Sequence, residues 1–264
     1  MSQPPSESHG DTELVVTTAQ DDAVLVLRLN RPHRLNALNE SLVDALEAAL
    51  AQAVDDERRA VIITGTGRAF CAGFDLKEDR DDGGLRQIDG QQRLAAALTS
   101  LPIPVVAAIN GLAVGAGCEI ALACDFVVAG SDAQFSLPEV LIGTGMGGGT
   151  SFLLGLTIGR IKASEFVLLG EPISAAQADA IGLISRVVEP DQLPAAAEEL
   201  AAKLVSRPPH AIATVKAALF RGLNQTFADA LSAELTEVHA AHFHPDSAAL
   251  MESFRHRSTG RTPA

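Results

Sequence analysis

The chain has 264 residues, a formal net charge of −13, an apolar fraction of 47% and a charged fraction of 20%. This composition is typical of a soluble globular protein that buries a sizeable core without disulfides or metals. The excess of acids excludes a general binder of nucleic-acid backbones, which basic surfaces hold. Residues 1–12 are polar and predict a disordered N-terminal tail rather than a signal peptide, and no segment has the roughly 18 apolar residues of a membrane helix.

Strand-like and helix-like segments alternate from residue 13 to about residue 190. Short apolar runs predict strands, and longer runs with apolar residues on one face predict helices. This alternation predicts an α/β core over 13–190 with buried, mostly parallel strands. The expected strands are 13–18, 23–30, 60–64, 105–109 and 125–129. One expected helix begins at Ser41, and two others cover about 87–100 and 113–124. The charged stretch 77–92 is expected to form a surface loop entering a helix.

The composition changes after Glu189 and Pro190, where helix-forming segments follow one another. We therefore expect a C-terminal helical region spanning 191–264. Its expected helices are 191–206, 208–222, 226–243 and 246–256.

The three cysteines, Cys71, Cys118 and Cys124, form no CxxC motif and leave one cysteine over in any pairing. Together with the polar N-terminus, they predict reduced thiols and a cytoplasmic location. The seven histidines show no zinc-ligand spacing with cysteines or acids, so we expect no metal site.

One glycine motif resembles a dinucleotide-binding fingerprint. Residues 143–148 match GxGxxG, and Glu165 follows at about the distance of a ribose-binding acid. However, Pro138 disfavours a central strand before the motif, and the motif lies in the middle of the chain rather than at a first strand–helix turn. We keep dinucleotide binding only as a disfavoured alternative.

Two acidic residues lie in apolar surroundings. Glu119 belongs to a small-residue helical pattern, and Glu139 stands within the apolar segment 135–142. A carboxylate in such surroundings is costly unless it has a partner or a function. Both acids are candidates for acid–base catalysis, and a helix cap or an arginine partner is an equally good interpretation of each.

Three glycine-rich turns stand before helices or after strands. They contain Gly73, Gly115 and the triplet 147–149. Such turns leave backbone N–H groups free, and these groups can converge on a developing oxyanion. The commoner use of such glycines is tight turning and close packing, and residue types alone do not decide between the two uses.

These segments together resemble the crotonase family, also called the enoyl-CoA hydratase/isomerase family. About 240 of the 264 positions fall within the resemblance by element order. The motifs that carry it are NRPHRLNAL at 30–38, FCAGFDLK at 70–77, PVVAAING at 104–111, GAGCEIALACD at 115–125, FSLPE at 135–139, GGGT at 147–150 and LGEPIS at 169–174. The resemblance implies a crotonase-like spiral of ββα units with a C-terminal helical trimerisation region, and trimers commonly paired into hexamers.

The resemblance also implies roles for single residues. The backbone N–H groups of Phe74 and Ala116 would form an oxyanion hole for a thioester carbonyl, and Glu119 and Glu139 would be the catalytic acids. The implied contacts to substrate or coenzyme A are Ala72, Asp75, Leu76, Lys77, Arg34, Gly115 and Gly147.

The implied reaction is hydration of the 2-trans double bond of an enoyl-CoA thioester, because family isomerases usually keep only the acid that matches Glu139. No cofactor is implied, since coenzyme A is part of the substrate. Alternatives are an enoyl-CoA isomerase or another crotonase reaction that uses mainly Glu139, and a non-catalytic acyl-CoA-binding protein. Met146 and Leu137 depart from the hydratase pattern near the acyl carbon, and the segment before the glycine triplet is one residue shorter.

Overall fold

The fold comes from a computed structural model and covers residues 14–19, 22–77 and 84–258. The predicted N-terminal tail, 1–12, lies outside these ranges. Within them, no helix combines the length and the apolar character that crossing a membrane would need.

Two sheets form the centre of the molecule. The larger sheet has the strand order β1-β2-β3-β5-β7-β10, and only its β1–β2 hairpin is antiparallel. Its strands are β1 (Val15–Ala19), β2 (Val24–Leu29), β3 (Ala60–Gly65), β5 (Val105–Ile109), β7 (Phe126–Gly130) and β10 (Arg186–Val188). The smaller sheet has the order β4-β6-β8-β9, and its strands are β4 (Ala69–Cys71), β6 (Leu112–Val114), β8 (Gln134–Ser136) and β9 (Ile173–Ser174).

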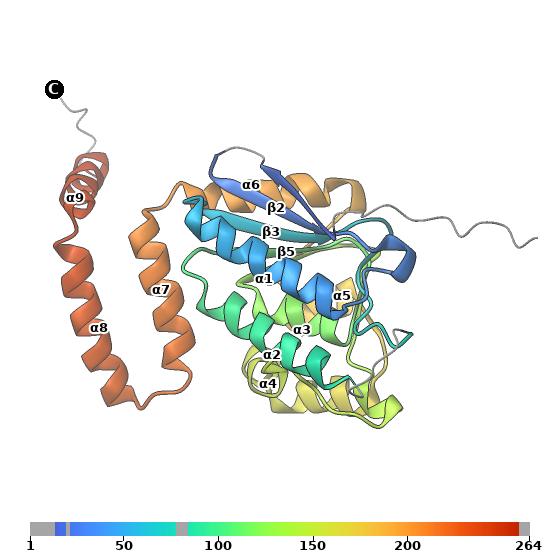
Figure 1. The fold of residues 1–264 in the computed structure, drawn as a ribbon. Coiled ribbons are helices and arrows are strands. Elements are labelled where there is room, and N and C mark those ends of the chain that lie inside the picture. The colour runs from blue at the N-terminus through green and yellow to red at the C-terminus, as the bar shows by residue number, and fades with distance from the viewer. Residues whose placement is uncertain (1–13, 20–21, 78–83, 259–264) are drawn as a thin grey trace, which may run out of the picture.

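Three successive ββα units connect the two sheets and confirm the expected spiral. Each unit places its first strand in the larger sheet and its second strand in the smaller one, and then continues into a helix. The units are β3–β4 with α2 (Leu85–Ser100), β5–β6 with α3 (Ala116–Ala123) and β7–β8 with α4 (Thr150–Leu169). The neighbouring strands β3, β5 and β7 of the larger sheet run parallel. Their carboxyl ends therefore lie at the same edge of the sheet (Figure 1).

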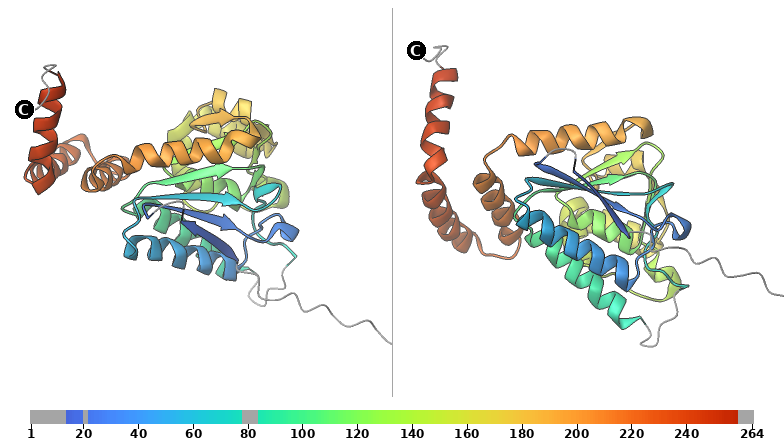
Figure 2. Two further views of the ribbon diagram at one scale, coloured as in Figure 1. Left: turned by 90° about the horizontal axis from the view of Figure 1, so that it is seen from above. Right: turned by 45° about the horizontal axis from the view of Figure 1, so that its top comes forward.

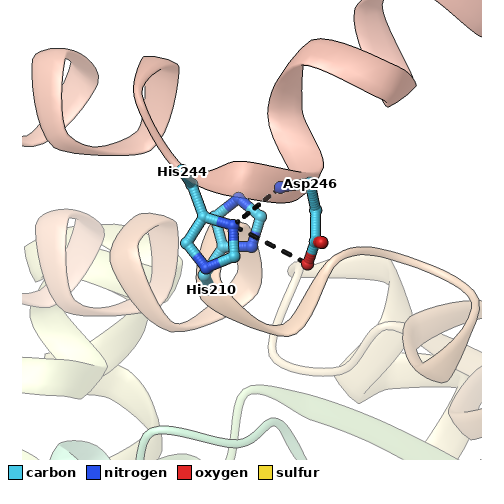
Figure 3. A group of neighbouring side chains, drawn as sticks. All are labelled: His210, His244 and Asp246. Atoms are coloured by element: carbon cyan, nitrogen blue, oxygen red, sulfur yellow. Dashed lines mark hydrogen bonds and ion pairs between the residues drawn. The ribbon is translucent and has the colours of Figure 1, made fainter.

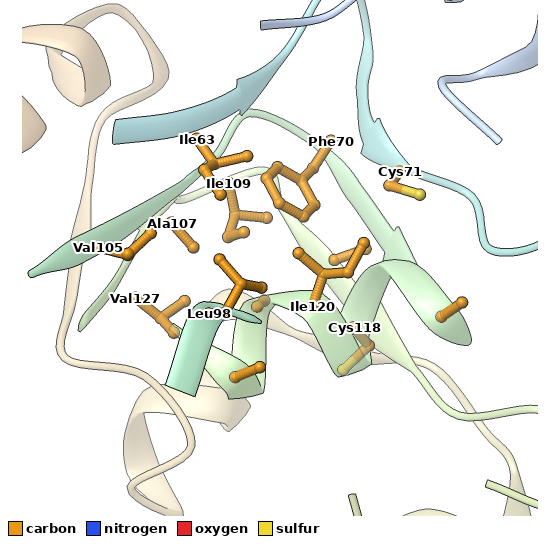
Figure 4. Close-up of a cluster of buried hydrophobic side chains, with 14 of the residues drawn as sticks. Ile63, Phe70, Cys71, Leu98, Val105, Ala107, Ile109, Cys118, Ile120 and Val127 are labelled. Atoms are coloured by element: carbon orange, nitrogen blue, oxygen red, sulfur yellow. The ribbon is translucent and has the colours of Figure 1, made fainter. Parts of the chain in front are cut away.

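Helices cover both faces of the larger sheet, as its uninterrupted apolar strands require. Val61 and Ile63 of β3 face the cluster beneath α1 (Glu40–Asp55), α2 and α3, part of which Figure 4 shows. The alternate residues Ala60 and Ile62 pack on the opposite side against α6 (Leu193–Val205) (Figure 2). This period of two follows from the pleat, which points successive side chains to opposite faces.

Several expected elements differ from the structure. The helix expected over 113–124 is wrong at its start, because Ala113 and Val114 belong to β6 and α3 begins at Ala116. Likewise α2 begins at Leu85, so the loop expected over 77–92 ends earlier than its charge pattern indicates. The strands missed in the sequence, β4, β6, β8, β9 and β10, have only two or three residues, too few to show an alternating pattern.

Three helices extend from the body at the C-terminal end. They are α7 (Pro209–Gly222), α8 (Phe227–His242) and α9 (Pro245–Ser258), and α8 and α9 lie away from the two sheets (Figure 1). The remaining short elements are η1 (Pro32–Arg34), η2 (Glu139–Ile142), α5 (Ala175–Ala180) and η3 (Pro190–Gln192).

A largely buried lysine fastens α7 to the core. The Lys216 ammonium donates to the carboxylate of Asp125 at 2.7 Å and to the carbonyl oxygens of Leu98 and Ile103 at 3.1 and 3.0 Å. Asp125 also accepts the N–H of Val105 at 2.8 Å. Since the side chains of Lys216 and Asp125 are 10% and 24% exposed, their charges are poorly hydrated and depend on each other.

We expect Lys216→Met to lower the free energy of unfolding by about 2–4 kcal/mol, because it leaves Asp125 and two carbonyl groups without their cation. Urea denaturation measures this loss. The matched control is Lys203→Met, which breaks an exposed pair with Glu199 and should cost about 0.5 kcal/mol or less. Equal losses in the two variants would contradict a special role for Lys216.

Candidate active site

Two tight turns from different ββα units touch each other. They contain Gly73, with φ of +88°, and Gly115, with φ of +52°, values that glycine adopts without strain. A Cβ atom on Gly73 would lie 3.0 Å from the carbonyl oxygen of Val114 and 3.7 Å from the nitrogen of Ala116. Because neither glycine has a side chain, the two turns can approach closely. The residues that follow them, Phe74 and Ala116, therefore lie close together.

The N–H groups of Phe74 and Ala116 both lack an acceptor among the residues that the structure describes. Leu38 pairs in parallel with Phe74, and it bonds through its own N–H and carbonyl to Gly73 and Asp75 at 2.7 and 2.8 Å. In such a pairing the N–H of Phe74 points to the opposite side. Ala116 is the first residue of α3, where N–H groups have no intrahelical partner. In the described ranges neither N–H donates a hydrogen bond, so both are free to meet an oxygen atom.

A cavity of about 450 Å³ opens in front of these two turns. One wall is formed by α2, and the opposite wall by η2 and the segment that leads to α4. Glu119 and Glu139 both line this cavity, together with Phe74 and Ala116. The two acids and the two N–H groups singled out in the sequence therefore meet at one place.

Glu119 is held at the floor of the cavity by α3 and is only 2% exposed. Its Oε1 accepts the backbone N–H of Gly147 at 2.7 Å. Burial raises the pKa of Glu119 to about 7, with a smaller contribution in the same direction from Glu139, while the Gly147 N–H opposes the shift. The hydroxyl of Thr150 lies near enough to oppose it slightly, although it forms no hydrogen bond of good geometry.

Glu139 is the first residue of η2, directly after Pro138. Its carboxylate lies against the second glycine turn, because a Cβ on Gly115 would come within 2.9 Å of Glu139 Oε1. Among the residues that the structure describes, its Oε2 has no hydrogen-bond partner although it is buried. Burial raises the pKa of Glu139, and its own backbone N–H partly offsets the effect. Neither Glu119 nor Glu139 has an arginine or lysine partner in the described ranges.

The structure separates the residues implied as substrate or coenzyme A contacts into two groups. Four line the cavity, namely Ala72, Leu76, Gly115 and Gly147. Asp75, Lys77 and Arg34 are not among its described lining residues.

Asp75 instead belongs to a small ion-pair cluster beside the first turn. Its carboxylate lies 2.9 Å from the guanidinium of Arg31 and 3.9 Å from that of Arg34. Burial raises the pKa of Asp75, but the N–H of Lys77 and the two arginines outweigh this and hold it below its ordinary value. These bonds fix the chain on either side of the Phe74 N–H, so Asp75 supports the turn rather than lining the cavity.

Two polar residues of the cavity region were missed in the sequence. Gln91 of α2 is 3% exposed and lines the cavity, and Thr150 at the start of α4 is fully buried. A signal for Gln91 was available, since it lies on the same helix face as Leu94 and Leu98. A polar residue within a buried apolar stripe points to a site, but the charged stretch around it obscured the start of the helix.

A second group of titratable side chains lies far from the cavity, where α7 meets the junction of α8 and α9. Potential ligand atoms of His210, His244 and Asp246 lie within 4.8 Å of one another (Figure 3). The two imidazole rings stack at 3.7 Å with an angle of 11°. Because the lone pairs of imidazole lie in the ring plane, stacked rings direct them in parallel and do not converge on one ion. The stack therefore serves as a contact between helices.

Comparisons with known proteins identify the family of the chain. The sequence model of the "Enoyl-CoA hydratase/isomerase" family matches residues 19–258. The chain is 43% identical over 213 residues to the 2,3-dehydroadipyl-CoA hydratase of Escherichia coli, covering 79% of this chain and 82% of that protein. It is 36% identical over 227 residues to the short-chain-enoyl-CoA hydratase of Clostridium acetobutylicum, covering 83% and 86%.

Solved structures give the same result. The enoyl-CoA hydratase of Bacillus anthracis superposes with a TM-score of 0.87 at 32% identity, over 95% of this chain and 98% of that one. The ββα spiral, the paired glycine turns and the two buried glutamates thus occur in a chain that belongs to the enoyl-CoA hydratase/isomerase family, the crotonases.

Proposed function

We propose that the cavity hydrates the 2-trans double bond of an enoyl-CoA thioester and yields the 3-hydroxyacyl thioester. The observation that carries this proposal is the meeting of two unengaged N–H groups, of Phe74 and Ala116, with two buried carboxylates in one cavity. The family and the named hydratases among its relatives support the same reaction.

The two N–H groups would bind the thioester carbonyl oxygen. Hydrogen bonds to this oxygen withdraw electrons from the conjugated double bond and make C3 electrophilic. They also stabilise the enolate that forms when water adds, and removing one such donor typically lowers the rate ~10²–10³-fold. Because the donors belong to the backbone, Phe and Ala serve at these positions as well as other residues.

Glu119 and Glu139 would exchange protons with the water and with C2. One carboxylate takes a proton as the water oxygen bonds to C3, and the other group gives a proton to C2, so a whole water molecule is added. A pKa of about 7 at Glu119 suits either step near neutral pH. A protein that only binds acyl-CoA has no use for two buried acids without cationic partners.

The reaction as proposed needs no cofactor, because coenzyme A is part of the substrate. We further propose that Ala72, Leu76, Gly115 and Gly147, which line the cavity, contact the acyl thioester. Lys77 and Arg34, both exposed, would meet the coenzyme A phosphates outside the cavity. The free thiols of Cys71, Cys118 and Cys124 support a cytoplasmic location.

We also propose that α8 and α9 assemble the chain into a homotrimer or a pair of trimers. Large apolar residues on and between these helices are exposed, with Phe227 at 80%, Phe254 at 70% and Phe243, which follows α8, at 81%. Neither helix has a fully buried side chain in the described ranges. Contiguous exposed apolar surface of this kind marks an association site.

For the catalytic acids, we expect Glu119→Gln and Glu139→Gln each to lower kcat on crotonyl-CoA about 10²–10⁴-fold. Loss of the conjugated thioester absorbance measures the rate. Glu165→Gln, which alters an exposed acid paired with Lys162, is the control and should keep full activity. Unchanged turnover in both catalytic variants would rule out the two-acid mechanism, and activity lost only in Glu139→Gln would favour the isomerase alternative.

The raised pKa of Glu119 also has a consequence for stability. Folding raises this pKa from 4.5 to about 7, so the folded state binds an extra proton between these values. The contribution of Glu119 to the free energy of unfolding is therefore most favourable below pH 4.5, and it is lost as the pH rises through 7. We expect Glu119→Gln to be more stable than the unchanged protein at pH 8, by up to about 3 kcal/mol, with a difference that shrinks toward pH 5. Urea unfolding at several pH values tests this, and a difference independent of pH would contradict it.

For the assembly, light scattering after gel filtration should give a mass of three or six chains. The double variant Phe227→Asp and Phe243→Asp should give single chains, because it places charges on exposed apolar positions at the two ends of α8. A single-chain mass for the unchanged protein would contradict the assembly, whereas it would leave the proposed chemistry untouched.

A further inference from the structure

Gln91 carries a buried amide nitrogen for which the described part of the chain offers no hydrogen-bond partner. The residue is 3% exposed, and in the part of the chain that the structure describes its Nε2 has no hydrogen bond. A buried amide that is left unpaired typically costs about 1–3 kcal/mol, so buried amides are normally bonded to protein or to a bound molecule. Because Gln91 also lines the cavity, its missing partner can come from the cavity.

Gln91 lines the same cavity as Glu119, and its amide lies beside Gly147. Gly147 links the two residues, since its N–H donates to Glu119 Oε1 and its α-carbon faces the Gln91 amide. A Cβ on Gly147 would lie 2.6 Å from Gln91 Oε1. A side chain at residue 147 would therefore displace the amide, whereas glycine lets it reach the cavity.

The position of Gln91 relative to a bound thioester follows from the other residues of the cavity. In the proposed binding mode the carbonyl would lie at Phe74 and Ala116, and C2 and C3 would lie between Glu119 and Glu139. The chain beyond C3 would then continue along α2, where Gln91 lines the cavity with apolar residues. The apolar neighbours on these walls are Ile88, Ile142 and Met146.

The charge of the cavity limits what the amide can bind. Its described lining contains two carboxylates, Glu119 and Glu139, and no lysine, arginine or histidine. A carboxylate on the acyl chain would be repelled by these acids and would meet no cation among the described lining residues. A neutral hydroxyl or carbonyl group has no such penalty, and an amide offers both a donor and an acceptor to it.

We propose that Gln91 determines substrate specificity by hydrogen-bonding an uncharged hydroxyl or carbonyl group that the acyl chain carries beyond C3. The proposal rests on the proposed hydration and names the substrate class of the same cavity: enoyl thioesters with an oxygenated acyl chain, rather than simple alkyl chains or chains ending in a carboxylate.

The test compares pairs of substrates in which a hydroxyl replaces a methyl group. The pairs are trans-4-hydroxybut-2-enoyl-CoA with trans-pent-2-enoyl-CoA, and trans-5-hydroxypent-2-enoyl-CoA with trans-hex-2-enoyl-CoA. In at least one pair the unchanged protein should have about a tenfold higher kcat/KM for the hydroxylated member, the value of one good hydrogen bond. Gln91→Leu should abolish this preference, through a lower kcat/KM for the hydroxylated substrate.

The matched control is Gln52→Leu, which alters an exposed glutamine of α1 outside the described lining of the cavity. It should leave the ratio within each pair as it is in the unchanged protein. Urea unfolding gives a second readout: Gln91→Leu should be at least as stable as the unchanged protein, because it removes an amide that has no partner in the fold.

Three results would overturn the inference. They are equal ratios in the unchanged protein and Gln91→Leu, a clear loss of stability in Gln91→Leu, and a preference for trans-hex-2-enedioyl-CoA, whose chain ends in a carboxylate. Failure of the proposed function looks different, since the unchanged protein would then hydrate no member of either pair.

Discussion

Two carboxylates buried in one cavity lose hydration and repel each other, and the rest of the site is built around this cost. Glu119 is 2% exposed and Glu139 is 9% exposed, and neither has a cation beside it in the described ranges. The hydrogen bond that the Gly147 N–H donates to Glu119 offsets only part of this cost of burial. The remaining cost appears as raised pKa values, which are what proton transfer near neutral pH requires. Stability and chemistry thus depend on the same burial.

Close approach of backbones is what brings the acids and the N–H groups together. Helix α3 can lie directly on β4 because residue 117 is glycine; a Cβ there would be 2.2 Å from the carbonyl oxygen of Cys71. The same contact holds the turn of Gly73 beside the turn of Gly115. Since the proposed oxyanion donors belong to the backbone, their positions depend on this packing more than on the side chains of Phe74 and Ala116. The buried Asn36 contributes from the other side, with its amide donating to the carbonyl oxygens of Thr66 and Ala69 at 3.0 and 2.8 Å.

The sequence allowed the long elements and the two acids to be predicted, for physical reasons. The strands of the larger sheet are apolar on both faces, and a glutamate such as Glu119 within small apolar residues is conspicuous. The second sheet was missed because strands of two or three residues carry no periodic signal, and their pairing depends on partners far along the chain. Gln91 was missed for a different reason, because the charged stretch around it obscured the start of the helix whose buried face it shares with Leu94 and Leu98. Only its contact with Gly147, 56 positions later, has no local signal. Asp75 shows another limit, because its ion pair with Arg31 depends on a residue 44 positions earlier and could not be read from its own motif.

The central claim is that this cavity adds water across an activated double bond, and isotope tracing tests it most directly. Crotonyl-CoA is incubated with the protein in ¹⁸O-labelled deuterium oxide, and the thioesters are analysed by mass spectrometry. The account predicts 3-hydroxybutyryl-CoA with ¹⁸O at C3 and deuterium at C2. Recovery of crotonyl-CoA or a shifted double-bond isomer, with deuterium exchanged into carbon but no oxygen gained, would contradict it.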